Sequence, residues 1–107
     1  MSDFIYLFRG ANPDAPQAHM QKWRDWMKDL GAKGHFKSGE PLESRGKVVK
    51  KNGVVTDGPF AEAKDLVGGF LLVSAKSLEE ATELAKGCPI FERDGFVEVR
   101  PVLQMSM

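Results

Sequence analysis

Two short segments of the chain are apolar at nearly every position. They are residues 4–8 (Phe-Ile-Tyr-Leu-Phe) and residues 69–73 (Gly-Phe-Leu-Leu-Val). Side chains of a strand point alternately to opposite faces, so a strand with one face in water should alternate between apolar and polar residues. These segments do not alternate. We therefore expect two inner strands of a sheet that is covered on both faces.

Between these strands, residues 17–30 have apolar side chains at helical spacing, which predicts an amphipathic helix. Pro16 suits the first turn of that helix, and Gly31 and Gly34 suit its end. The apolar stripe consists of Met20, Trp23, Trp26, Met27 and Leu30.

A second helix is predicted to start at Ser77, where Ser77 and Glu80 have the spacing of a capping box. It should end at Gly87 and Pro89, because proline cannot continue a helix. The side chains that we expect it to bury are Leu78, Ala81, Leu84 and Ala85.

The middle of the chain predicts a β-hairpin. Two valine pairs, at 48–49 and 54–55, flank Asn52-Gly53, which tolerates the positive φ values of a type I′ turn. A turn at residues 57–60 and one helical turn at 61–65 are expected next, whereas residues 35–45 are ambiguous. Residues 96–105 alternate in polarity and predict a last strand, and Pro101 within it favours an edge position.

The predicted order is strand, helix, strand with hairpin, strand, helix and strand, in one domain over residues 1–107. This order predicts an α+β fold, a ferredoxin-like split βαβ with an inserted β-hairpin. Two helices can cover only one face of such a sheet. The second apolar face then needs a partner sheet, most simply from a symmetry-related copy, so we expect a face-to-face homodimer.

Composition excludes several classes of protein. Lysine and arginine together number 15, as do aspartate and glutamate, so the basic excess typical of nucleic-acid binding is missing. Cys88 is the single cysteine, and two histidines without a metal-binding spacing predict no metal site. The apolar run near the N-terminus is too short for a signal peptide or a membrane span, so we expect a cytoplasmic protein that does not bind membranes.

The segment Asp57-Gly58-Pro59-Phe60-Ala61-Glu62-Ala63-Lys64-Asp65, with Val67-Gly68-Gly69-Phe70 after it, resembles the DGPF signature of the YCII-related proteins. Three more blocks fit that pattern, and they extend the resemblance over nearly the whole chain. They are residues 39–42 (Gly-Glu-Pro-Leu), 77–89 and 97–102 (Val-Glu-Val-Arg-Pro-Val).

The resemblance implies a dimeric α/β barrel arrangement, in which two sheets face each other across a cleft. In the wider group, lyase chemistry on small molecules is attributed to a His–Asp pair, with the histidine near the start of the first helix. His19 matches this position, but Cys88 precedes Pro89 where the family has its aspartate. Our hypothesis is that Asp57 takes its place. The DGPF branch is also associated with extracytoplasmic-function sigma factors.

His19 and Asp57 are therefore the candidate catalytic residues, with Phe60, Glu62 and Arg100 as candidate substrate-binding residues. Each has a simpler reading as well. His19 could be a core histidine, Asp57 a turn cap, Phe60 a packing residue, and Glu62 and Arg100 solvated charges.

Two functions follow from these candidates. The first is a dimeric small-molecule-binding domain with lyase- or isomerase-like acid–base chemistry and no cofactor, in which Arg100 would hold an anionic substrate. The alternative is a non-catalytic regulatory module that interacts with a sigma factor. A cofactor-free monooxygenase is a third reading, which rests on analogy of fold alone.

Overall fold

A computed structural model gives the structure of the chain and describes residues 1–10, 16–58 and 66–105. Strand β1 (Ser2–Arg9) leads to helix α1 (Gln17–Ala32) and strand β2 (Phe36–Pro41). The hairpin strands β3 (Gly46–Val49) and β4 (Val55–Gly58) follow, joined by the 3-10 turn η1 (Lys51–Gly53). Strand β5 (Val67–Ala75), helix α2 (Leu78–Ala85), the 3-10 helix η3 (Pro89–Arg93) and strand β6 (Phe96–Pro101) complete the order.

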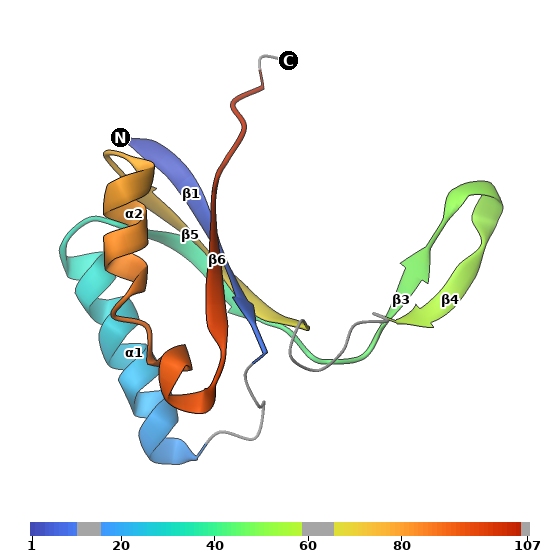
Figure 1. The fold of residues 1–107 in the computed structure, drawn as a ribbon, viewed down its shortest axis with the longest axis horizontal. Helices are drawn as coiled ribbons and strands as arrows, with labels where there is room; N and C mark the ends of the chain where they lie inside the picture. The colour runs from blue at the N-terminus through green and yellow to red at the C-terminus, as the bar shows by residue number, and fades with distance from the viewer. Residues whose placement is uncertain (11–15, 59–65, 106–107) are drawn as a thin grey trace.

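Four strands form one antiparallel sheet in the order β2-β5-β1-β6, which is the order of a ferredoxin-like fold. The two segments predicted to be inner strands are β1 and β5, and both lie inside the sheet. Strand β6 lies at an edge, as Pro101 predicted, since a proline has no amide hydrogen for a further ladder. The α+β fold with an inserted hairpin is thus confirmed (Figure 1).

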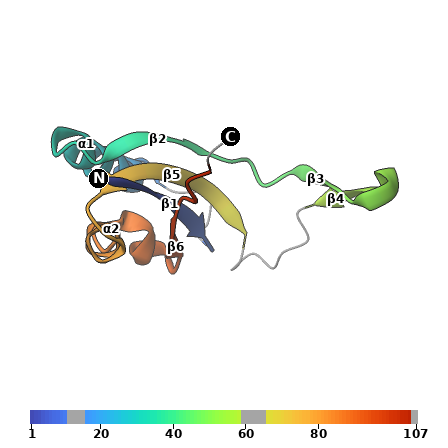
Figure 2. The ribbon, with the colours of Figure 1, turned by 90° about the horizontal axis from the view of Figure 1, so that it is seen from above.

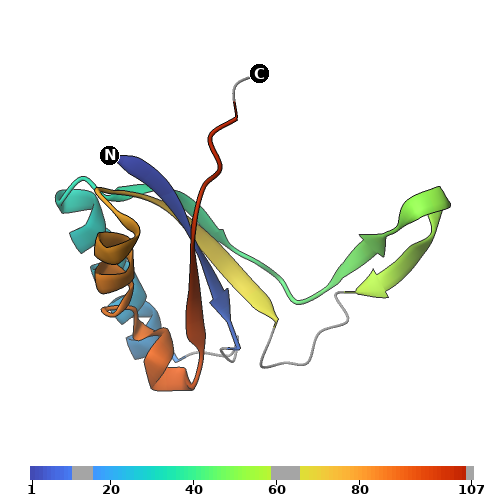
Figure 3. The same cartoon turned by 45° about the horizontal axis from the view of Figure 1, so that its top comes forward.

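Both helices lie on the same side of the sheet (Figures 1 and 3). Alternate residues of the inner strands are buried against them, and Trp26 and Leu30 of α1 join this core. The buried strand residues are Phe4, Tyr6, Phe8, Leu71, Val73 and Ala75. The Tyr6 hydroxyl donates a hydrogen bond to the Ala81 carbonyl at 2.5 Å and so ties α2 to β1.

The opposite face of the sheet, here called the open face, has Ile5 and Leu7 of β1 opposite Leu72 and Phe70 of β5. These four side chains are only partly buried. No described helix covers them (Figures 1 and 2). The non-alternating pattern of the two strands thus corresponds to one buried face and one apolar face that the described helices leave uncovered.

Local sequence signals account for the helix ends. Gly34 has a φ of +81°, and the amide of His35 donates to the Leu30 carbonyl at 2.8 Å, so Gly34 terminates α1 as predicted. Gly31, the other predicted terminator, lies inside the helix. The Ser77 hydroxyl accepts from the Glu80 amide at 3.1 Å, as the capping box predicted. The Glu80 carboxylate accepts from Lys76, one residue before the cap.

Two predicted core residues are corrected. Met20 and Leu78 are both exposed. Met20 lies at the margin of the apolar stripe of α1. Leu78 stands in the first turn of α2, before the core residues Ala81 and Ala85. Periodicity identifies the apolar side of a helix but not how far the covered surface extends along it.

The ambiguous residues 35–45 contain the edge strand β2, whose side chains are mostly exposed. It exists because β5 supplies its ladder, and only glycine fits at position 39, where a Cβ would overlap the Phe70 carbonyl and the Leu71 side chain. The predicted hairpin is present, with φ values of 67° at Asn52 and 76° at Gly53. Its turn has three residues, Lys51–Gly53, rather than two. Within the described residues, no helix is long and apolar enough to span a bilayer.

Candidate functional site

His19 is a buried polar side chain in the first turns of α1. The indole Nε1 of Trp23, one turn later, donates a hydrogen bond to His19 Nε2 at 3.0 Å. Trp23 in turn packs edge-on against Phe8, with ring centroids 4.8 Å apart. Since Nε2 accepts this bond, the neutral imidazole carries its proton on Nδ1.

The other ring nitrogen of His19 faces Glu92 of η3. Nδ1 lies 3.4 Å from Glu92 Oε2, and Lys22 Nζ lies 2.9 Å from Glu92 Oε1. The bond from Lys22, with a smaller contribution from His19, lowers the pKa of the Glu92 carboxyl. An ionised carboxylate therefore faces the Nδ1 proton.

Trp23, His19, Glu92 and Lys22 form what we call the His19 cluster. His19 was a candidate from the sequence, whereas Glu92 was not. The family's aspartate precedes the proline after the second helix, whereas Glu92 follows Pro89 by three positions in η3. The short helix η3 turns the chain back toward α1, and an acidic residue shortly after that proline was the available signal.

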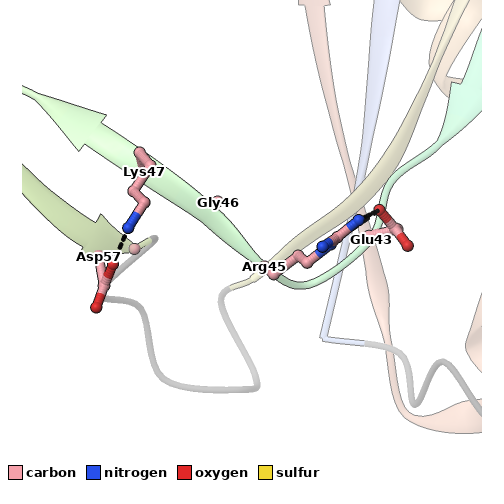
Figure 4. Close-up of a pocket in the computed structure, with 6 residues that line it drawn as sticks. Glu43, Arg45, Gly46, Lys47 and Asp57 are labelled. Atoms are coloured by element: carbon pink, nitrogen blue, oxygen red, sulfur yellow. Dashed lines mark hydrogen bonds and ion pairs between the residues drawn. The ribbon is translucent and has the colours of Figure 1, made fainter.

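Asp57, the predicted partner of His19, lies on the hairpin strand β4 and is exposed. It is paired across the hairpin with Lys47 of β3, with which it makes an ion pair. The residues at the hairpin base border an open hollow of about 550 Å³ (Figure 4). Its lining consists of Glu43, Arg45, Gly46, Lys47, Asp57 and Gly58.

Arg100 lies on the open face, opposite Ile5 of β1. Glu98 shares this face, as predicted, but its ion pair is with Arg9, at 2.9 Å between Nε and Oε1. Because α1 packs on the other side of the sheet, His19 and Arg100 are on opposite sides. Within one chain, the structure thus places His19, Asp57 and Arg100 in three separate environments. Phe60 and Glu62 lie outside the described residues.

Two other titratable side chains, Cys88 and His35, lie in structural settings. Burial raises the pKa of the Cys88 thiol to about 12, which suppresses its thiolate. His35 directly precedes β2, and its Nδ1 lies 2.8 Å from the Ser74 carbonyl oxygen of β5. Among the residues described, no three histidine, cysteine, aspartate or glutamate side chains gather as ligands of a metal ion.

Comparisons with known proteins place this geometry in context. The profile of the YCII-related domain matches residues 4–106. Among solved structures, the chain is similar to 5-chloro-2-hydroxyhydroquinone dehydrochlorinase from Burkholderia phenoliruptrix AC1100, solved in complex with 2,5-dihydroxybenzoquinone. The two chains are 19% identical, the match covers 89% of this chain and 90% of that one, and the TM-score is 0.47. No curated protein matches this chain.

Proposed function

The chain belongs to the YCII-related domain family, and on this premise we propose that it is a dimeric small-molecule-binding domain with cofactor-free acid–base chemistry of the lyase or isomerase type. The observation that carries the proposal is the His19 cluster. A buried imidazole has one nitrogen on an indole N–H and the other facing a carboxylate. This is the arrangement by which a carboxylate orients a general base.

The proposed reaction uses His19 Nε2 as the base. Trp23 is partly buried, so a turn of its side chain would free Nε2 for a ligand. Nε2 then takes a proton from an acidic C–H of the ligand, and the electron pair of that bond stays on the ligand as an enolate. The imidazolium returns the proton to a different ligand atom in an isomerisation, or to the leaving group in an elimination.

Glu92 and Lys22 have positioning roles in this proposal. The Glu92 carboxylate would hold the Nδ1 proton and offset the positive charge of the imidazolium. Lys22 favours the ionised form of Glu92, in line with the lowered pKa of that carboxyl. His19 thereby has an acidic neighbour within the chain, and Asp57 is not needed as its partner.

The open face supports the proposal of a homodimer. Ile5, Leu7, Phe70 and Leu72 form an apolar surface there that the described helices leave uncovered, and a second copy would bury it. In such a dimer Arg100 would line the space between the two sheets, where its guanidinium suits an anionic group. That space lies on the opposite side of the sheet from His19, so the ligand that His19 deprotonates would not contact Arg100 of the same chain. We retain Asp57 of the hairpin, together with Phe60 and Glu62, as proposed ligand contacts.

Proton abstraction can be measured before the net reaction is known. The protein is incubated in D2O with a panel of aromatic and enolic carboxylic acids, and ¹H NMR follows the loss of ligand C–H signals. We expect exchange with at least one acid, and its loss in His19→Gln with an unchanged circular dichroism spectrum. His35→Gln is the matched control, because His35 contacts a backbone carbonyl rather than a carboxylate. Equal exchange rates in His19→Gln and the native protein, or no exchange with any acid of the panel, would contradict the proposal.

Glu92→Gln adds a readout that a purely structural role would not move. The amide keeps the shape of the side chain but loses its charge, so the pH profile of the exchange rate should change while the chain stays folded. An unaltered profile would remove Glu92 from the mechanism.

A further inference from the structure

The hairpin stands apart from the rest of the molecule. We call residues 46–58 (β3, η1 and β4) the arm. In the described residues its strands pair only with each other, and Figures 1 and 3 show the arm projecting beyond the sheet on the side away from the helices. The radius of gyration is 15.2 Å, whereas a compact domain of this length should have about 13 Å. The single chain is therefore less compact than a globular domain of its length.

An arm of this kind does not have enough contacts of its own to be stable. Each of its strands has four residues, and a two-stranded hairpin alone in water is at best marginally stable. Its apolar side chains also face solvent. Val49 and Val55 form a cross-strand pair and are 72% and 56% exposed, and Val54 in the turn is exposed too. A surface from outside the chain is needed to bury them.

A second copy of the chain supplies such a surface. The arm extends on the side of the sheet that bears the open face, where the second protomer of the proposed dimer would lie. Under two-fold symmetry each arm reaches the other protomer. The exposed valines of the arm and the apolar open face, which both contact solvent in the single chain, are then buried in the same interface. The charges of the arm base are mixed, with Arg45 and Lys47 beside Glu43 and Asp57, which fits an interface between identical, neutral chains.

We propose that the arm packs on a second copy of the chain, and that this copy closes the hollow at the arm base into a ligand site. The inference rests on the proposed dimer and goes beyond it. The hollow, of about 550 Å³, has the size of a small-molecule pocket but is open on one side in the single chain. Arg45 and Lys47 would bind an anionic group of the ligand, and Asp57 would fix the Lys47 ammonium in place.

The first experiment tests the contact between the arm and a second copy. In Val49→Lys/Val55→Lys, two solvent-facing valines of the arm become lysines. If the arm is buried in the dimer, sedimentation analysis should show dimerisation weakened by at least about tenfold. Leu78→Lys is the matched control, since Leu78 is a 41% exposed apolar residue on α2, away from the arm. An unchanged dimerisation constant in the double lysine variant would overturn the inference.

The second experiment tests closure of the hollow through acetylation of lysines by an N-hydroxysuccinimide ester, followed by mass spectrometry. Lys47 and Lys33 are a matched pair, because each makes an ion pair with one aspartate and is well exposed in the single chain, at 67% and 58% of the side chain. In the dimer Lys47 should react several-fold more slowly than Lys33, and the difference should disappear in Val49→Lys/Val55→Lys. If Lys47 reacts as fast as Lys33 in a stable dimer, the arm site fails and the dimeric domain stands. A protein that is monomeric at all concentrations would refute both.

Discussion

Replacing Trp23 by phenylalanine isolates the hydrogen bond that holds the His19 cluster. The variant keeps an aromatic ring beside Phe8 but removes the indole N–H that His19 Nε2 accepts at 3.0 Å. His19 is buried, so Nε2 loses its donor where water does not readily replace it. A buried acceptor without a partner costs about 1–3 kcal/mol. The loss of part of the indole from a half-buried position adds roughly 1 kcal/mol.

The expected fall in the unfolding free energy of Trp23→Phe is therefore about 2–4 kcal/mol, and for a domain of this size each kcal/mol lowers Tm by about 4 °C. Trp26→Phe is a matched control for the hydrogen bond. Its indole Nε1 lies 3.4 Å from the Leu84 carbonyl, a long and weak contact, so its loss should reflect the smaller ring rather than a lost donor.

A double-mutant cycle with His19→Leu separates the hydrogen bond from the change in volume. Leucine has no acceptor, so Trp23→Phe should cost about 1–2 kcal/mol less in that background. Urea unfolding of the four proteins gives the coupling energy. If Trp23→Phe costs the same with His19 as with leucine, the hydrogen bond contributes nothing measurable and the account of the His19 cluster is refuted.

Two further predictions concern pH. Burial raises the pKa of Cys88 to about 12 from an ordinary value of 9.0. Above pH 9 the unfolded chain therefore loses a proton that the native state keeps, and the free energy of unfolding should fall by up to about 1.4 kcal/mol per pH unit. Urea unfolding at pH 8 and pH 10 measures this fall, which should be shallower in Cys88→Ala. Lys22, and to a lesser extent His19, lower the pKa of Glu92 below its ordinary value of 4.5, so the stability that Glu92 contributes is present above pH 4.5 and lost as the pH falls through the native pKa. The free energy of unfolding should therefore depend less on pH at acid pH in Glu92→Gln than in the native protein. An equally weak pH dependence in Glu79→Gln would contradict the assignment.

Much of the fold could be predicted because the signals are local. The non-alternating strands, the capping box at Ser77 and the glycine at position 34 each act within a few residues, and each is present as predicted. Strand β2 could not be predicted from its own pattern, since an exposed edge strand depends on the ladder of β5. Met20 and Leu78 were misplaced because the limits of a covered surface depend on what packs there.

The candidate site was harder to predict than the fold. His19 could be found from its place in the helix, but its acidic neighbour is on η3, far away in the sequence. Asp57 was an attractive partner because it begins the most distinctive motif of the chain, yet strand pairing places it opposite Lys47 on the arm. Contacts between distant segments depend on chain path and register, to which single residues give no direct signal.

By itself the sequence determined the order of the elements, the two inner strands and the family, because periodicity, capping and turn chemistry act over short distances. Only the tertiary structure decided that Glu92 rather than Asp57 faces His19, that His19 and Arg100 lie on opposite sides of the sheet, and that the hairpin projects as an arm. The physical reason is that an imidazole, a carboxylate and a guanidinium interact only over a few ångströms, and folding sets those distances.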